Sequence, residues 1–303
     1  MSYRYYIIDA FSQQAFGGVP VAVFPRCGGI PESQLPLLSS EMLAVDTVFL
    51  GTETPESGYS ARVFDGGHEV QAGAHTQLAA IAALLKSGQL ALDNGEAQLQ
   101  LHTLGNLVDV HVDTREALHP IMLNQVVTPQ IDPYVPSYAE IAATIGLSES
   151  DIASNRYSTL IVNCGKPYLI VPLKSYHAVR EASFNQNDWA RSSLPQSLVD
   201  SILLFAPSTE SGAGEFHTRL LEQGAPHGSD PAVGDVMPAF AAFLCQQKQV
   251  RKGTHSFTVK RGPNDGRQSH LHLEMDHRGE DSFKLRIGGC AVASTSAEIL
   301  SAA

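Results

Sequence analysis

The chain has 303 residues, of which 43% are hydrophobic and 17% are charged, and its formal net charge is −11. This composition is typical of a globular protein, and the length suits two domains of ordinary size with buried cores. The acidic balance and the lack of any Lys/Arg run disfavour nucleic acid or an anionic membrane as a partner.

The N-terminal segment MSYRYYIIDAF lacks the long apolar run and the small-residue cleavage site of a signal peptide. No stretch of the sequence approaches the roughly 20 apolar residues of a membrane span. We therefore expect a cytoplasmic protein. Four cysteines, Cys27, Cys164, Cys245 and Cys290, are far apart without a CxxC pair. They predict reduced thiols and no structural metal.

Most segments along the chain predict short strands, because they are rich in β-branched and aromatic residues and are bounded by Gly, Pro or Asn. We expect strands at 3–11, 21–25, 47–50, 59–64, 97–103, 107–113, 160–163, 168–173, 201–207, 256–260, 270–275 and 283–289. Regular alternation of strands and helices is absent, which disfavours a Rossmann sheet. An amphipathic helix is predicted at 137–147, after a Pro-rich segment, 127–136, that is a candidate linker.

Two further segments predict helices of an unusual kind. The stretch QAGAHTQLAAIAALLKSG (71–88) carries no charge from Thr76 to Leu85, and DPAVGDVMPAFAAFLCQQ (230–247) is likewise apolar all round. A surface helix shows one polar face, so these patterns predict enclosed helices at 76–86 and 236–247. Pro238 falls in the first turn of the second helix, where a missing N–H costs little.

The residues before the two helices also match each other. Each copy has an aromatic residue, a polar pair, Arg (Arg62, Arg219), two apolar residues, a loop, and then Gly (Gly73, Gly234) at the helix start. A repeat at about half the chain length predicts two similar domains rather than a solenoid, unless short apolar patterns coincide by chance. In such domains, short strands would curl around one central helix whose N-terminus is left at one end.

Five segments in order resemble the PhzF-like (phenazine biosynthesis-like) isomerase family, whose fold is shared with diaminopimelate epimerase. They are IIDAFSQQAFGGVPVAVFP, EMLAVDTVFL, QAGAHT, SDPAVGD and RIGGCAV. The resemblance implies an α+β protein of two pseudo-symmetric domains, each a mostly antiparallel sheet or barrel around a central apolar helix. It places 1–126 and a returning C-terminal strand, 286–303, in the first domain, and 127–285 in the second.

The same resemblance implies a cofactor-independent isomerase that acts on a small molecule bound between the domains, and family members are often homodimers. Two helix N-termini that face one cleft would offer N–H groups and positive dipole ends to a ligand. We therefore expect Gly73, Ala74, Asp230 and Gly234 to bind substrate. An acid in this cleft could move a proton between neighbouring carbons while the amides stabilise the developing charge.

This chain departs from the family pattern at the residues that would react. Asp46 stands where the family has its proton-shuttling Glu, so the acid is one methylene shorter. At the first helix start, Ala74 aligns with the family's His and His75 with its Pro. One residue is about 100° around a helix, so His75 lines the cleft only if the loop shifts by one position. His68, in the preceding loop, is expected to be solvated.

At the second helix start the family's Thr-Gly-Ser is replaced by Val233-Gly234-Asp235. We expect Asp235 to cap the helix by accepting hydrogen bonds from the N–H groups of Met237 or Ala239, which would oppose an anionic substrate. Failing that, Asp235 is a direct catalytic group. The two cysteines of the related epimerases are replaced by Ala72 and Val233, which disfavours a two-thiol racemase.

Three functions remain open from the sequence. The first is the proton-transferring isomerase, with Asp46, His75 and Asp235 as catalytic candidates. The second is a family member that has lost catalysis and serves as a small-molecule binder or interaction protein. The third is a hydrolase or lyase in which Asp46, Asp230, Asp235 and His75 form a new acid–base group.

Overall fold

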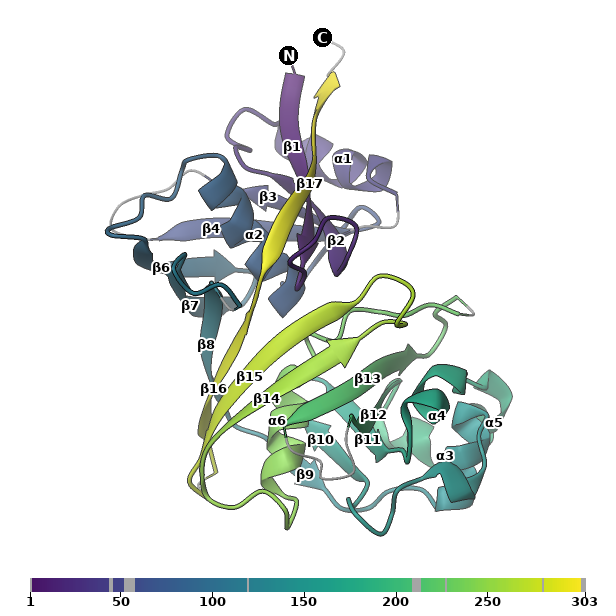
Figure 1. Cartoon of the computed structure of the whole chain (residues 1–303). Coiled ribbons are helices and arrows are strands. Elements are labelled where there is room, and N and C mark those ends of the chain that lie inside the picture. The colour runs from purple at the N-terminus through teal and green to yellow at the C-terminus, as the bar shows by residue number, and fades with distance from the viewer. Residues whose placement is uncertain are drawn as a thin grey trace. The chain divides into compact units, whose positions relative to one another are not determined.

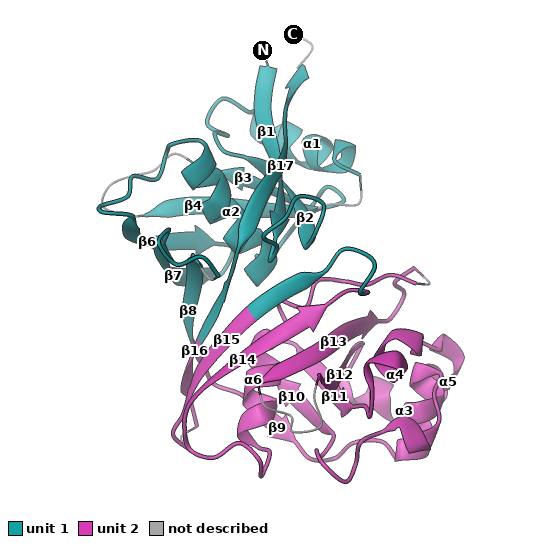
Figure 2. Ribbon diagram, in the orientation of Figure 1, with its two compact units in different colours: residues 1–125, 264–271, 286–303 teal, residues 126–263, 272–285 magenta. Residues whose placement is uncertain are grey.

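The computed structural model describes residues 2–43, 46–51, 58–118, 120–208, 214–226, 228–279 and 281–300. They divide into two compact units: unit 1 has residues 1–125, 264–271 and 286–303, and unit 2 has residues 126–263 and 272–285 (Figure 2). Compared with the division expected from the sequence, the segment 264–271 joins unit 1. Residues 301–303 of the expected C-terminal segment lie outside the described residues. Across the described ranges, no helix is both long and apolar enough to cross a membrane.

Unit 1 is built from strands around one long helix (Figure 1). Its elements are β1 (Ser2–Ala10), β2 (Val19–Phe24), η1 (Glu32–Gln34), α1 (Leu35–Glu41), β3 (Asp46–Leu50), β4 (Tyr59–Asp65), β5 (His68–Val70), α2 (Ala74–Lys86), β6 (Glu96–Thr103), β7 (Asn106–Asp113), β8 (Ile121–Val127) and β17 (Ala291–Leu300). The last two residues of β8 belong to unit 2.

Unit 2 repeats this plan and adds short helices (Figure 1). Its elements are β9 (Gln130–Asp132), α3 (Tyr138–Ile145), η2 (Glu149–Asp151), β10 (Leu160–Asn163), β11 (Pro167–Pro172), α4 (Tyr176–Glu181), α5 (Gln186–Arg191), η3 (Leu194–Ser197), β12 (Ser201–Pro207), β13 (Glu215–Glu222), α6 (Met237–Cys245) and β14 (Gly253–Arg261). Two strands, β15 (Ser269–His277) and β16 (Phe283–Gly289), have residues in both units.

Both central helices are enclosed, as the sequence predicts. Every residue of α2 from Ala74 to Leu84 is buried, and the helix packs against β1, β2, β3, β4 and β17. In α6 all residues but Pro238 and Cys245 are buried, and the helix packs against β10 and β11. Burial on all sides explains the absence of a polar face, because nearly every position of each helix contacts protein instead of water.

The sheet pairings show that the internal repeat is structural. In unit 1, β1–β2 is antiparallel, β2–β3 parallel, β3–β4 antiparallel and β4–β6 parallel. Unit 2 has the same sequence of pairings in β10–β11, β11–β12, β12–β13 and β13–β14. The registers agree too, because Arg62 pairs with Phe49 as Arg219 pairs with Leu204. The α+β class with two similar halves is therefore confirmed.

The segments expected as strands are strands, and the amphipathic helix at 137–147 is α3. Ser137 and Glu140 form a capping box at its start, and Gly146 ends it with a positive φ of 67°. The candidate linker, 127–136, is only partly irregular, because it contains β9, which pairs with β10. Pro129 and Pro133 flank this short strand, and prolines at both of its ends made it unrecognisable in the sequence.

Candidate functional site

An acid and an imidazole meet at the start of the enclosed helix of unit 1. Asp46 is the first residue of β3, and His75 is the second residue of α2. The His75 Nε2 and Asp46 Oδ2 atoms are 2.6 Å apart. The His75 side chain is 8% exposed, whereas that of Asp46 is 27% exposed. The pair therefore has a buried partner that fixes its geometry and a carboxylate that solvent or a ligand can reach.

The local fold explains why these two side chains meet. Asp46 begins β3 opposite Val21 of the parallel strand β2, so its position is fixed by the sheet. The helix α2 begins directly after its N-cap, Gly73, and this start directs His75 at Asp46. The question that the sequence left open, which way His75 faces, is thus answered within unit 1. The exposed His68 stands apart from the pair, at the start of β5.

The first turn of α2 has the features of an anion site. Gly73 offers no side chain to cap the helix, and its φ of −83° and ψ of 166° are open to any residue. Two buried polar side chains of this turn donate to carbonyl groups that precede the helix. Thr76 Oγ1 donates to the Gly73 carbonyl, and Gln77 Nε2 donates to the Ala72 carbonyl. The first N–H groups of the helix, including that of Ala74, thus have no capping side chain at Gly73 to compete with a ligand.

The second helix start differs from the expectation. The helix α6 begins at Met237 with Val236 as its N-cap, so Asp235 lies one residue too early to cap it. Asp235 is exposed, and the Met237 N–H donates to the Gly234 carbonyl at 3.3 Å instead. The predicted capping by Asp235 is therefore wrong. The cause is a turn over Gly234, Asp235 and Val236 that delays the helix.

Asp230 has strong partners that the sequence analysis did not identify. Its carboxylate lies 2.8 Å from an Arg180 guanidinium nitrogen and 3.5 Å from Arg261 Nε. The Asp230 side chain is 13% exposed, and the two arginines are 20% and 12% exposed. Arg261 also donates to the Pro231 carbonyl at 3.1 Å. These contacts brace the turn that leads to Gly234.

Asp9, a buried and hydrogen-bonded carboxylate of β1, was not identified from the sequence. Its side chain is fully buried, and it accepts hydrogen bonds from the Phe16 N–H at 2.7 Å and from Arg267 at 3.0 Å. Arg267 also donates to the Gly17 carbonyl at 2.7 Å. Asp9 thereby holds the 11–18 loop in place. A lone acid within the apolar strand YYIIDAF was the available signal.

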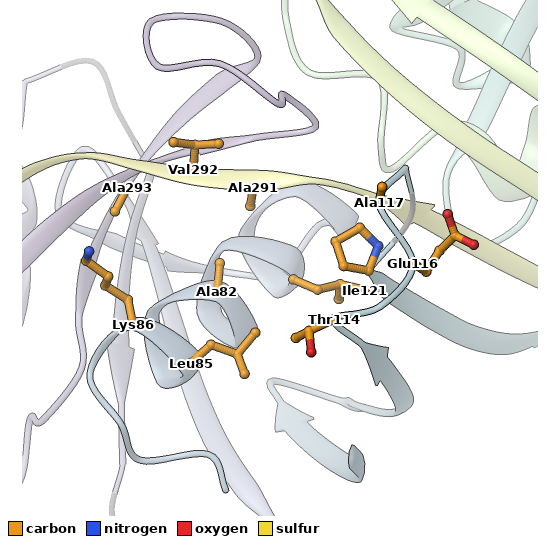
Figure 3. A pocket seen from close by; sticks show the side chains of 11 residues that line it. Ala82, Leu85, Lys86, Thr114, Glu116, Ala117, Ile121, Ala291, Val292 and Ala293 are labelled. Atoms are coloured by element: carbon orange, nitrogen blue, oxygen red, sulfur yellow. The ribbon is translucent and has the colours of Figure 1, made fainter. Parts of the chain in front are cut away.

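A cavity of unit 1 lies away from the Asp46–His75 pair. It has a volume of about 600 Å³ and lies at the other end of α2, between that helix, the 114–121 segment and β17 (Figure 3). Its lining is mostly aliphatic, with Ala82, Leu85 and Ile121 among the side chains, and Lys86 and Glu116 at its polar parts.

Two partly buried cysteines, Cys164 and Cys245, have weakly acidic thiols. Burial raises the pKa of the Cys164 and Cys245 thiols to about 11. Both thiols are therefore protonated at neutral pH and are poor nucleophiles. Among the residues that the structure describes, no three His, Cys, Asp or Glu side chains come together as a metal site would require.

Comparisons with known proteins agree with this architecture. Residues 8–297 match the family model described as phenazine biosynthesis-like protein. An uncharacterized isomerase of Mesorhizobium japonicum is 23% identical over 95% of this chain and 96% of its own. The trans-2,3-dihydro-3-hydroxyanthranilate isomerase of Pseudomonas aeruginosa is 22% identical, over 95% of each chain. The crystal structure of a PhzF-family protein of Bacillus anthracis superposes with a TM-score of 0.84 at 19% identity, over 99% of each chain.

Proposed function

Because this chain belongs to the phenazine biosynthesis-like protein family, we propose that it is a cofactor-independent isomerase that moves a proton within a small molecule. The observation that carries the proposal is the 2.6 Å contact between Asp46 and His75 at the start of a buried helix. Relatives across the whole length of the chain are named isomerases, which supports the same reaction class.

In the proposed reaction, the Asp46 carboxylate removes a proton from a carbon beside an unsaturated group and returns it to a neighbouring carbon. His75 holds the carboxylate in place and shares its proton during the transfer. The N–H groups of the first turn of α2 stabilise the enolate-like charge that develops meanwhile. The proton lost by one carbon is gained by another, so the reaction needs no oxidant or reductant.

We propose that the substrate binds at the start of α2, where Gly73 and Ala74 supply N–H groups. Gly234 and Asp235, at the start of the equivalent helix, are proposed as further substrate contacts. We propose the exposed Asp235, at the turn before α6, as a second catalytic group. The Asp230 carboxylate is held by Arg180 and Arg261, which supports a bracing function rather than proton transfer.

The two alternatives have less support. The hydrolase or lyase requires Asp230 as one of four acid–base groups, and two guanidinium groups occupy its carboxylate. A non-catalytic binder has no need for the buried imidazole fixed against Asp46, since burying a polar ring costs free energy unless it is hydrogen-bonded. The short contact of this pair is better explained by catalysis.

The test is proton exchange in deuterated water, followed by NMR. The protein is incubated with small unsaturated and cyclic carboxylic acids, headed by the substrate named for the Pseudomonas aeruginosa relative. We expect deuterium at one carbon of the product. Asp46→Asn should lower the rate at least about 100-fold, as loss of a general base does. Asp46→Glu, which restores the family's residue, should retain activity.

The matched control is Asp65→Asn, at an exposed position in the same unit, which should leave exchange unchanged. Circular dichroism of each variant shows that folding is preserved. Exchange that survives Asp46→Asn at the parent rate would overturn the proposal.

A further inference from the structure

Arg62 and Arg219 are equivalent residues of the two units, but they have different partners. Each arginine lies three residues after an aromatic residue, Tyr59 in β4 or Phe216 in β13. Each aromatic residue pairs with a residue of a parallel strand: Tyr59 with Leu101 of β6, and Phe216 with Val259 of β14. In unit 1, the Glu69 carboxylate accepts two hydrogen bonds from one edge of the Arg62 guanidinium. Arg62 Nε donates to Glu69 Oε1 at 2.9 Å, and Arg62 Nη2 donates to Glu69 Oε2 at 2.7 Å. Glu32 bonds the remaining edge.

In the part of the chain that the structure describes, no carboxylate accepts a hydrogen bond from Arg219, although this arginine is far more buried. It is 6% exposed, and its Nη1 donates to the Arg180 and Ala182 carbonyls, each at 2.7 Å. Its Nη2 has one long contact, 3.4 Å, to the Ser229 carbonyl. Within the described residues its Nε–H has no hydrogen-bond partner. The unsatisfied edge, Nε with Nη2, is the edge that Glu69 occupies on Arg62.

A cavity of about 100 Å³ lies against this arginine. Arg219 lines it together with Ser183, Ala225, Gly228 and Ser229, from β13 and the loops around it. A buried donor without a partner costs about 1–3 kcal/mol, so a native structure calls for an explanation such as a bound ion. The cavity has room for a group the size of a carboxylate or a phosphate.

The local charge also favours an anion. Arg180 lies close enough to Arg219 to repel it and to lower its pKa, in addition to the larger effect of burial. Asp230 is a nearby carboxylate, and it forms ion pairs with Arg180 and Arg261. Three guanidinium groups therefore lie around this carboxylate. Glu222 also lines the cavity, but its carboxylate lies towards Lys166, 3.9 Å away, and burial raises its pKa.

We propose that unit 2 binds a small oxyanion, a carboxylate or phosphate group, in the cavity beside Arg219, where the anion takes the place that Glu69 has on Arg62. The anion accepts two parallel hydrogen bonds from Arg219 Nε and Nη2, the geometry in which arginine binds carboxylates and phosphates most strongly. Such a ligand ties Ala225, Gly228 and Ser229 to β13. These residues lead directly into Asp230 and Gly234, so anion binding rigidifies the second helix start.

The test is calorimetric titration of the full chain with inorganic phosphate and, separately, with acetate, at constant ionic strength set by chloride. We expect saturable binding of one anion per chain. Tighter binding of phosphate identifies a phosphate ligand, and tighter binding of acetate identifies a carboxylate. Arg219→Gln should weaken the binding at least tenfold. Asp65→Asn, at an exposed position of unit 1, is the control and should bind as the parent does.

A second variant pair keeps the test decisive if Arg219→Gln does not fold. Ala225→Glu places a tethered carboxylate in the cavity, so it should abolish anion binding and raise the melting temperature of the anion-free protein. Ala225→Gln has nearly the same shape without the charge, and it should leave anion binding within threefold of the parent. The proposal is overturned if neither anion gives saturable heat, or if Ala225→Glu binds the anion like Ala225→Gln.

Discussion

Unit 1 and unit 2 enclose their central helices with different side chains. The helix α2 is rich in alanine and aliphatic residues and begins with the polar His75, Thr76 and Gln77. The helix α6 is surrounded by aromatic rings instead: Phe240 lies 5.1 Å from Phe205 and 5.3 Å from Phe216, measured between ring centroids. One architecture thus holds an aromatic core in one unit, and in the other an aliphatic helix that begins with polar residues.

The same contrast appears at the reacting positions. The sheet registers make Asp46 equivalent to Ser201, and counting from Gly73 and Gly234 makes His75 equivalent to Val236. Ser201 is buried and donates to Asp200 at 2.7 Å, and Val236 is fully buried. The repeat therefore preserves the scaffold and not the acid–imidazole pair. The repeat supplies two helix starts, and the acid–imidazole contact is found at one of them.

The largest stability effects should separate the two cores. Phe240→Ala removes a ring that several aromatic side chains contact, and it should lower the free energy of unfolding by about 4 kcal/mol. Leu78→Ala in α2 should cost about 3 kcal/mol, because the alanine-rich surroundings leave a smaller cavity. Urea unfolding measures the totals, and hydrogen exchange shows which helix opens. Phe16→Ala, at a position 71% exposed, is the control and should change stability by less than about 0.5 kcal/mol.

The two equivalent arginines should differ next. Arg219→Met leaves the buried Arg180 and Ala182 carbonyls without their donor, and it should cost about 3 kcal/mol. Arg62→Met breaks partly exposed ion pairs with Glu69 and Glu32, so it should cost about 1 kcal/mol. Urea denaturation of both variants gives the comparison. Equal losses would show that burial does not distinguish the two units here.

The smallest effects concern pH, and they should have opposite signs in the two units. Hydrogen bonds from Arg62 lower the pKa of Glu69 from its ordinary 4.5, so its contribution is full above pH 4.5 and is lost as pH falls through the lower folded-state pKa. Glu69→Gln should therefore cost about 1 kcal/mol at pH 7 and nothing near pH 2.

Burial raises the pKa of Glu222 above 4.5, so the folded state disfavours its charge and stability falls as pH rises from 4.5 through the folded-state pKa. Glu222→Gln should stabilise the protein at pH 7, by less than about 1 kcal/mol, and have no effect below pH 4. Urea midpoints from pH 3 to pH 8 check both variants. If both substitutions changed stability at pH 7 in the same direction, the contrast between the paired Glu69 and the buried Glu222 would be contradicted.

Much of the fold was predictable because its signals are local. A helix without a polar face must be buried, and the matching residues before α2 and α6 indicated the repeat. The six-residue helices α4 and α5 were not predicted, because they depend on single caps, Ser175 and Asn185, rather than on periodicity. Short helices have too few turns for an apolar pattern to stand out.

The candidate site was predictable in its residues and less so in its geometry. Asp46 and His75 were identified from the sequence, but whether they meet depends on the residue at which α2 begins. A change of one residue in that start turns a side chain by about 100°. The same sensitivity explains the error at Asp235, where α6 starts one residue later than expected. The partners of Asp230 come from β14 and α4, which no local pattern could connect.

The pairing of β1 with β17 has a consequence for how the protein is made. These strands run side by side from Ser2 opposite Leu300 to Ala10 opposite Ala291 (Figure 1). During synthesis β1 is made long before β17. The first strand can pair early with β2, but it can pair with β17 only after the intervening chain has been made. Most of unit 2 lies in one continuous stretch, residues 126–263, and can gather while the nascent chain is still tethered. Unit 1, although its first strands emerge early, is completed only after β17 has been made.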